Sequence, residues 1–320
     1  MVFPPRTMSE ERNCIMKTPL GAVLVTGTSS GMGKACALRL VRAGYVVFAG
    51  VRQERDAQTL KQAGSSRLIP VILDVTDEHT IAAAVSLIRE TVGDAGLVGL
   101  VNNAGVAVTA PMEVVPLEEL RRRFDINVFG QVAVIQAFLP LIRQARGRIL
   151  NVSSVGGKVT IPFNGAFCSS KYALESISDA LRMELLPWGI HVIVIEPGSI
   201  RTAAGDKLDA DSEAMLKRFS ASGTKLYAQA YRAFVQSLLK IEEEGVGPEV
   251  MAEIALRALT ARTPRKRYPV GPKSRLLPLL ATFLPTNALD AFRTRLFGVP
   301  HQFGSAPRFS HRVDLERKGQ

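Results

Sequence analysis

A glycine-rich segment near the start of the chain has the residue types and the spacing of a phosphate-binding turn. Residues 26–33 read TGTSSGMG, with glycines at positions 27, 31 and 33. Glycine has no Cβ, so the backbone of such a turn can approach a phosphate closely. A helix that starts there offers unpaired backbone N–H groups to the same phosphate. Because a short apolar run precedes the segment and a helical pattern follows it, we predict a pyrophosphate-binding site at this turn.

The turn belongs to an alternation of short β-branched runs and longer helical patterns. The predicted strands are Ala22–Thr26, Val46–Val51, Arg67–Leu73, Leu97–Asn102, Arg148–Ser153 and His191–Glu196. The main helical patterns between them are Glu78–Thr91, Leu117–Gln144 and Ala166–Leu186. Apolar strands that alternate with helices are typical of a parallel sheet covered on both faces. We therefore predict an α/β fold, a Rossmann-type doubly wound parallel sheet in a single domain.

The pattern divides the chain into three stretches. Residues 1–19 contain no apolar run, do not resemble a signal peptide, and are expected to form a flexible extension. Residues 20–264 form the predicted domain, and residues 265–320 a basic, partly apolar tail. Inside the domain, an insert at about 201–247 has apolar residues at helical spacing. We expect amphipathic helices that cover a substrate pocket; the alternative is a surface excursion. In the tail, Pro278 and Pro285 exclude one long helix.

The charge is concentrated at the C-terminal end. The net charge is +11, and the residues from Arg265 onward contain eleven Lys and Arg against three Asp and Glu, so +8 of the excess lies there. The nearly neutral body argues against a nucleic-acid-binding surface. A basic tail leaves open peripheral contact with an anionic membrane or with a partner. No apolar run reaches the roughly 18 residues of a membrane span.

The cysteines and histidines are sparse. Three cysteines, Cys14, Cys36 and Cys168, argue against a disulfide framework and for a reducing compartment, so we expect a cytoplasmic protein. No CxxC pair or histidine cluster has the spacing of metal ligands, so no metal site is predicted.

Several motifs occur in an order that resembles the short-chain dehydrogenase/reductase family, over roughly residues 20–260. The segment 26–33 resembles the family's TGxxxGxG fingerprint, residues 102–105 its NNAG, and residues 197–202 its PGxxxT. The resemblance implies a nicotinamide dinucleotide, with Asp74 at the adenine ring. The cofactor-binding residues that we predict are Gly27, Ser29, Ser30, Gly31, Met32, Gly33, Arg52, Asp74, Val75, Asn103, Ala104, Gly105, Lys171, Pro197, Gly198, Ile200 and Thr202.

The end of the second predicted strand favours NADP(H) over NAD(H). An NAD site has an acidic residue there to accept a hydrogen bond from the ribose 2′-hydroxyl. In this chain Val51 cannot accept one, and Arg52 would pair well with a 2′-phosphate. Ser30 and Lys34 could assist. The alternative is that Arg52 is a solvated charge after a strand.

The resemblance also implies a catalytic set of Asn, Ser, Tyr and Lys, and one member is missing. Asn127, Ser154 and Lys171 match the family's Asn, Ser and Lys. Hydride transfer to a carbonyl requires a hydrogen-bond donor and then a proton at the substrate oxygen. The family's tyrosine should lie four residues before the lysine and thirteen after the serine, and both counts give Phe167. Phenylalanine keeps the ring but cannot donate a proton.

No neighbouring side chain is an obvious substitute. Each helical residue turns about 100°, so Tyr172 should lie roughly 140° around the helix from the tyrosine position, and Cys168 about 100° away. Ser154 can donate but has no suitable pKa. A water held by Asn127 and Lys171 is the best remaining proton source. Three interpretations stay open: an enzyme whose tyrosine was replaced by design, a natural and weakly active reductase, or a non-enzymatic nicotinamide-binding sensor or partner-binding protein.

The substrate and the assembly are predicted from the same resemblance. Residues 155–164 and 267–271, with the 276–285 stretch, look like the retinol and hydroxysteroid dehydrogenase branch. That implies a bulky apolar alcohol or ketone, such as a steroid, a retinoid or a long-chain carbonyl compound. Family members are usually dimers or tetramers, and Leu117–Gln144 and Ala166–Leu186 are the helices that could join subunits.

Overall fold

A computed structural model describes residues 19–63, 65–202 and 208–300, and these form an α/β domain around one parallel sheet. The sheet has seven strands in the order β3-β2-β1-β4-β5-β6-β7. All neighbouring strands are parallel, with registers such as Val23 opposite Val47 and Leu100 opposite Ile149. The bounds are β1 Ala22–Val25, β2 Val46–Val51, β3 Leu68–Ile72, β4 Gly99–Asn102, β5 Arg148–Val152, β6 His191–Pro197 and β7 Arg267–Val270.

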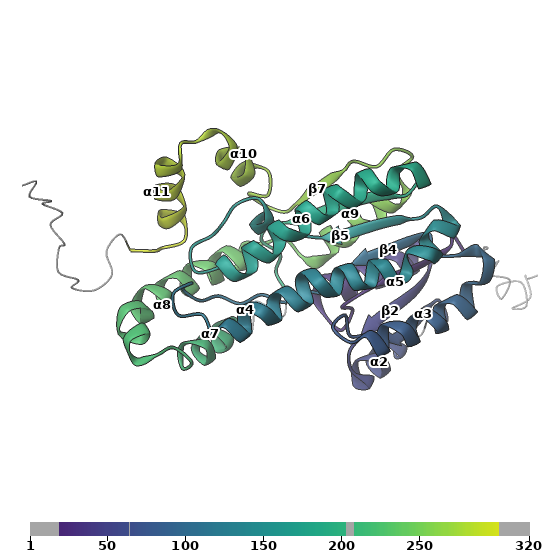
Figure 1. Cartoon of the computed structure of the whole chain (residues 1–320), viewed down its shortest axis with the longest axis horizontal. Coiled ribbons are helices and arrows are strands. Elements are labelled where there is room, and N and C mark those ends of the chain that lie inside the picture. The colour runs from purple at the N-terminus through teal and green to yellow at the C-terminus, as the bar shows by residue number, and fades with distance from the viewer. Residues whose placement is uncertain (1–18, 64, 203–207, 301–320) are drawn as a thin grey trace, which may run out of the picture.

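Helices cover both faces of the sheet because the strands are apolar on both sides. Helices α1 (Gly31–Ala43), α2 (Glu54–Lys61) and α9 (Pro248–Thr260) pack with Val23 and Val25 of β1 in one cluster of buried side chains. Helices α3 (Glu78–Val92), α5 (Gly130–Ala145) and α6 (Gly165–Leu185) contribute to a second cluster with Leu24 and Leu100. The doubly wound Rossmann-type sheet in a single domain is therefore confirmed (Figure 1).

A widened turn joins α4 (Leu117–Phe124) to α5. Residues Asp125–Phe129 form a π-helical turn, and Asn127 lies inside it, fully buried. The whole stretch Leu117–Ala145 is long and apolar enough to cross a membrane, but half of its most apolar window is buried inside the domain. Such burial is typical of a core helix. We therefore assign this stretch to the helices that pack on the sheet, in agreement with the helix predicted at Leu117–Gln144.

Four further helices lie beyond the sheet, at one end of the molecule in Figure 1. They are α7 (Leu208–Leu216), α8 (Ala221–Glu243), α10 (Leu276–Phe283) and α11 (Thr286–Leu296). Tyr231 and Phe234 of α8 are buried in a third apolar cluster with Phe219 and Phe297. Helices α7 and α8 thus lie within the predicted insert at about 201–247, and α8 buries Ala230, Tyr231, Phe234 and Val235. The short helical turns Gly93–Ala95, Val155–Gly157 and Leu186–Trp188 complete the described elements.

Two elements differ from the sequence prediction. The strand β7 pairs with β6, so the sheet extends to Val270 and the predicted tail begins inside the fold rather than after it at position 265. Pro269 weakens the strand pattern, but β7 is the edge strand, where proline is tolerated. Helix α2 was not predicted because it is short and polar. The N-terminal extension up to residue 18 and the tail beyond residue 300 lie outside the described residues.

Candidate active site

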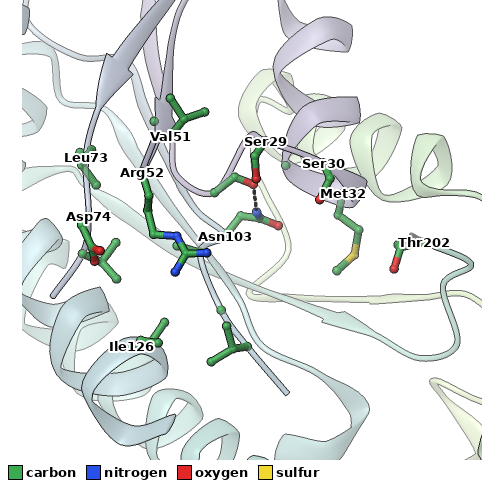
Figure 2. Close-up of a pocket in the computed structure, with 18 residues that line it drawn as sticks. Ser29, Ser30, Met32, Val51, Arg52, Leu73, Asp74, Asn103, Ile126 and Thr202 are labelled. Carbon is green, nitrogen blue, oxygen red and sulfur yellow. Dashed lines mark hydrogen bonds between the residues drawn. The ribbon is translucent and has the colours of Figure 1, made fainter. Parts of the chain in front are cut away.

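The carboxyl ends of β1, β2 and β4 surround a hollow that contains the glycine-rich turn (Figure 2). Its volume is about 280 Å³. In a doubly wound sheet, ligands bind at this edge, where the strand order reverses between β1 and β4. The lining residues are Gly27, Ser29, Ser30, Gly31, Met32, Gly33, Gly50, Val51, Arg52, Leu73, Asp74, Val75, Asn103, Ala104, Gly105, Val106, Ile126 and Thr202.

The glycine-rich turn has a backbone that side chains would disrupt. Gly27 has φ +69° and Gly31 has φ +54°, a region that favours glycine. A Cβ on Gly33 would lie 2.1 Å from the carbonyl oxygen of Gly27. Ser30 begins α1 without capping it through its side chain, which leaves the first N–H groups of the helix to a ligand. The turn therefore fits the pyrophosphate of a dinucleotide.

Side-chain hydrogen bonds hold the neighbouring loops against this turn. The backbone N–H groups of Asn103 and Ala104 both donate to Thr26 Oγ1 at 2.9 Å. Asn103 Nδ2 donates to the carbonyl oxygens of Thr26 at 3.0 Å and Gly27 at 3.2 Å. Asn102 points elsewhere, and its Nδ2 donates to the Gln131 carbonyl oxygen inside the core. The second asparagine of the NNAG motif thus fixes the turn, and the first fixes the sheet to α5.

The far end of the hollow contains Asp74 and Arg52. Asp74 Oδ1 accepts hydrogen bonds from Thr76 N at 3.0 Å and Thr76 Oγ1 at 2.8 Å, which orients the carboxylate. Arg52 is exposed at the end of β2, and Figure 2 shows its guanidinium reaching into the hollow between Asp74 and Asn103. The residues at this end of the hollow could hold the adenosine half of a dinucleotide.

A second, more apolar cavity of about 300 Å³ continues from the first. The two share Met32, Asn103, Gly105, Val106 and Thr202, so they form one continuous groove. The predicted residues Ser154, Phe167, Lys171, Pro197, Gly198 and Ile200 line this second part. Apolar side chains from the helices outside the sheet close it: Leu208, Leu238, Ile241, Leu277, Leu296 and Phe297.

Three of the four predicted catalytic positions meet in this cavity. Lys171 Nζ donates to the Val152 carbonyl oxygen at 2.8 Å and lies 5.8 Å from the centre of the Phe167 ring. Burial lowers the pKa of Lys171 to about 8, and Glu175 partly opposes the shift. Ser154 Oγ accepts from Gly156 N at 3.0 Å and donates to the Pro197 carbonyl oxygen at 3.4 Å. The site can orient a substrate oxygen, but Phe167 has no hydroxyl to offer it.

Asn127 lies behind the cavity and lines neither part of the groove. Its Oδ1 accepts from Val106 N, and its Nδ2 donates to the Val106 carbonyl oxygen, both at 2.9 Å. Nδ2 also donates to Ser170 Oγ at 3.0 Å. The side chain therefore ties the π turn to the loop after β4 and to α6, which positions Lys171 from behind.

The two possible substitutes for the tyrosine are directed away from the cavity, as the helical angles implied. Tyr172 is 42% exposed on the outer side of α6, and neither it nor Cys168 lines the groove. Cys168 is fully buried, and desolvation raises the pKa of its thiol to about 11. Neither side chain can supply a proton to a bound substrate. Cys36 is also free and buried, and Cys14 lies outside the described residues.

A network of charged side chains, of which Glu175 and Glu196 are buried, lies next to the part of α6 that contains Lys171. Glu175, one turn after Lys171, pairs with Arg267 at 3.0 Å and with Lys158 at 3.2 Å. Arg267 also pairs with Asp179 at 2.9 Å and with Glu196 at 3.2 Å. Burial, with the charge of Glu175, raises the pKa of Glu196 to about 6. Arg267 therefore joins β7, β6 and α6 below the site. Within the described residues, no group of acidic, histidine or cysteine side chains could hold a metal ion.

Sequence reasoning missed several polar residues of the cavity. Asn164, Thr109, Glu242 and Lys273 line it, and none belongs to a motif that marks chemistry. Asn164 lies at the end of a stretch that resembles the family, directly before α6 and three residues before Phe167. Glu242 and Lys273 come from the insert and from the segment after β7, whose position in space the sequence pattern does not fix.

The chain belongs to the short chain dehydrogenase family, whose model matches residues 21–213. It is 35% identical over 289 residues to retinol dehydrogenase 5 of Mus musculus, covering 88% of this chain and 90% of that one. It is 36% identical over 285 residues to 17-beta-hydroxysteroid dehydrogenase type 6 of Bos taurus, with the same coverage. It is 35% identical over 272 residues to the NADPH-dependent 3-dehydrocapnine reductase of Ornithobacterium rhinotracheale, covering 83% of this chain and 94% of that one.

A solved structure agrees with these relatives. A short-chain dehydrogenase from Streptomyces avermitilis superposes with a TM-score of 0.67 at 28% identity, covering 86% of this chain and 95% of that one. The predicted family, its retinol dehydrogenase-like branch and the oxidoreductase class acting on CH–OH groups are thus confirmed.

Proposed function

We propose that this chain interconverts an apolar secondary alcohol and its ketone with NADP(H), the substrate being a steroid, a retinoid or a long-chain carbonyl compound. The observation that carries the proposal is the apolar cavity that continues from the cofactor hollow and contains Ser154 and Lys171. Apolar side chains of α8, α10 and α11 close this cavity. Substrate pockets for apolar molecules have this composition, with a few placed polar groups that fix orientation. The names of the relatives support the same substrate class.

Some residues of the site would bind the cofactor, and others would polarise the substrate oxygen. The nicotinamide, when bound, supplies or accepts the hydride. The turn from Gly27 to Gly33 would hold the pyrophosphate, and Pro197, Gly198 and Ile200 would line the nicotinamide end. Ser154 can donate a hydrogen bond to the substrate oxygen. Lys171 lies within the cavity wall and, as an ammonium, places a positive charge beside that oxygen.

We further propose that Phe167 makes this chain a slow catalyst as it stands. The ring occupies the place of a general acid but has no proton to give, so a water near Lys171 must supply it. The same observation favours a second candidate, a non-enzymatic nicotinamide-binding sensor or partner-binding protein that keeps the cofactor site and has lost the chemistry.

The preference for NADP(H) rests on Arg52. Its guanidinium is exposed and reaches over the hollow, while Val51 beside it is buried and has no acceptor (Figure 2). A guanidinium pairs with a phosphate through charge-assisted hydrogen bonds, which a 2′-hydroxyl cannot match.

Membrane contact and self-assembly complete the proposal. Helix α10 leaves Leu276, Leu279 and Phe283 exposed by 52%, 56% and 75%, next to the exposed Arg275. We propose that this face makes peripheral contact with an anionic membrane, at the end of the molecule where the apolar cavity lies. Exposed Phe129 and Met183, on the turn before α5 and on α6, support the predicted dimer or tetramer; sedimentation of the purified chain tests that assembly.

Single-turnover kinetics on two proteins test the proposed function. Oxidation of bound NADPH by a panel of steroid, retinoid and long-chain ketones or aldehydes is measured for the parent and for Phe167→Tyr. A positioned general acid contributes on the order of 10²–10⁴ in rate, so we expect the tyrosine variant to be faster by about that factor. Cofactor affinity should change little, because position 167 lies in the second part of the groove.

Either of two results would contradict the proposal. If Phe167→Tyr is no faster with any ketone that binds, the site has diverged further and the sensor function gains support. If the parent is already fast, another donor supplies the proton, and Lys171→Ala is the next variant to measure.

A further inference from the structure

The amide of Asn164 is buried in the wall of the substrate cavity without a partner for its oxygen. The residue is 7% exposed and lines the cavity. Its Oδ1 accepts no hydrogen bond from any residue that the structure describes. Asn164 is the N-cap of α6, but its side chain does not cap the helix. A buried amide oxygen without a partner costs about 1–3 kcal/mol, so its presence here requires a reason beyond helix capping.

The position of Asn164 relative to Phe167 supplies that reason. Asn164 is the N-cap that directly precedes α6, and Phe167 lies three residues further on, in the first turn of the helix. Helical side chains lean toward the N-terminus, so the ring at position 167 covers the turn that begins at Asn164. The ring also lies close to the catalytic serine, since a Cβ placed on Gly156 would be 3.3 Å from Phe167 Cε1 and 3.4 Å from Ser154 Oγ.

We infer that Asn164 binds the reacting oxygen of the substrate together with Ser154, and so replaces part of what a tyrosine hydroxyl would do at position 167. The inference rests on the proposed function, since it assigns a residue to the oxygen of the same alcohol or ketone. The amide approaches that oxygen from the turn that precedes the ring, and Ser154 approaches it from the loop after β5.

An amide suits both forms of the substrate. Its oxygen accepts a hydrogen bond from the hydroxyl of the alcohol, and its NH₂ group donates one to the carbonyl oxygen of the ketone. Rotation of the amide by half a turn exchanges the two. The amide stabilises negative charge on the oxygen as it develops but transfers no proton. Asn164 is thus a binding and polarising residue, and the proton still comes from elsewhere.

A matched pair of ligands isolates this contact. Calorimetric binding of a steroid ketone and of the same steroid with a methylene group in place of the carbonyl is measured in the presence of NADP⁺. The proteins are the parent, Asn164→Ala and Asn164→Asp. One neutral hydrogen bond corresponds to an affinity change of about three- to tenfold. We expect Asn164→Ala to weaken ketone binding by that factor and to leave the binding of the methylene compound unchanged.

The Asn164→Asp variant separates the hydrogen-bond donor of the amide from the size of the side chain. At pH 8, where a carboxyl is ionised, Asn164→Asp keeps the size and an acceptor but has no donor. It should retain the alcohol and lose affinity for the ketone. In the Phe167→Tyr background, Asn164→Ala should reduce kcat/KM less than in the parent, because the tyrosine hydroxyl then binds the same oxygen.

Two outcomes would contradict the inference, and they distinguish its own failure from the failure of the proposed function. If Asn164→Ala weakens the ketone and the methylene compound equally, the amide only shapes the cavity and the inference fails alone. If the parent binds neither compound, nor any ketone of the panel, the proposed substrate class fails first and the inference with it. Thermal unfolding of each variant reports whether it folds; because the side chain makes no capping hydrogen bond, we expect midpoints close to that of the parent.

Discussion

The hollow that fits the cofactor and the cavity that fits the substrate are built from different parts of the chain. The first is made by backbone turns and short side chains at the ends of β1, β2 and β4, and most of its residues lie before position 110. The second adds side chains from α6, α8, α10 and α11, which lie far along the chain. Its chemistry depends on a few side-chain atoms placed on helices.

Two positions show what this difference means. One methyl group at Gly33 would meet the Gly27 carbonyl oxygen at 2.1 Å, so a minimal change there would distort the cofactor turn. At position 167, one oxygen atom is missing relative to the family, and the ring still packs at the edge of the third apolar cluster. The cofactor hollow depends on the backbone, so a change that disturbs the backbone also disturbs binding. The substrate cavity depends on side chains, so it can lose a catalytic group while the fold stays intact.

The largest effect on stability that we predict concerns the support of the catalytic half. Arg267→Ala removes the cation shared by Glu175, Asp179 and Glu196, of which Glu175 and Glu196 are buried. Glu175 keeps its pair with Lys158, and Asp179 keeps its pair with Arg182, so Glu196 is the buried carboxylate that loses its cation. Leaving one buried polar group without its partner costs about 1–3 kcal/mol. Urea denaturation should show a loss of that order in the free energy of unfolding.

A matched arginine on the surface provides the control. Arg232 pairs with Glu213 at 2.7 Å, with both side chains about half exposed. Exposed pairs of this kind contribute little to stability, because water and salt screen the two charges. Arg232→Ala should therefore leave the midpoint nearly unchanged. Equal losses for the two variants would show that the buried network does not support α6.

The next prediction concerns the cofactor half. We expect NADPH to bind more tightly than NADH, and Arg52→Ala to weaken NADPH by roughly 1.5–3 kcal/mol, the range of a hydrogen bond to a charged group. NADH affinity should not change, because no 2′-phosphate is present. Both dissociation constants are measured by quenching or enhancement of cofactor fluorescence. Equal affinities of the parent for the two cofactors would refute the assignment.

The sequence predicted these two halves unequally, for a physical reason. The strands and the glycine-rich turn follow a local pattern, so β1 to β6 and the turn could be predicted from that pattern. Arg52 was predicted from its place at the end of a strand, and Asp74 from the resemblance to the family; both line the hollow. The edge strand β7 was missed because it has only four residues and because Pro269 is atypical of a strand. Asn164 and Glu242 were missed as cavity residues because only tertiary packing brings them to the cavity that also contains Ser154.

A smaller effect is expected at the apolar face of α10. Replacing Leu279 and Phe283 by serine removes two side chains that are 56% and 75% exposed, so folding should be unaffected. Burial of such side chains in a bilayer is worth about 1.5–3 kcal/mol each when complete, and anionic lipid adds attraction for nearby basic residues. The double variant should float less with anionic liposomes than the parent. Leu117→Ser, which is equally exposed elsewhere, is the control; no difference between the variants would remove the membrane proposal.

The last prediction is a pH dependence that separates the chemistry of the catalytic half from its stability. Burial lowers the pKa of Lys171 from 10.5 to about 8, so the ammonium is lost as the pH rises through about 8. The rate of ketone reduction should fall above that pH, approaching a tenfold loss per pH unit if the ammonium is required. A rate that stays constant to pH 10 would show that Lys171 need not be charged.

The free energy of unfolding should rise over the pH range in which the rate falls. Between about pH 8 and 10.5 the unfolded chain keeps the proton on Lys171 and the folded chain releases it. The unfolded state then binds more protons than the folded state. The contribution of Lys171 to the free energy of unfolding therefore increases as the pH rises. Urea denaturation at pH 8 and pH 10 measures the gain, and Lys171→Met, which has no charge to lose, provides the reference for all other titrating groups. If the difference between parent and variant is the same at both pH values, Lys171 titrates outside this window, and the loss of rate must come from another group.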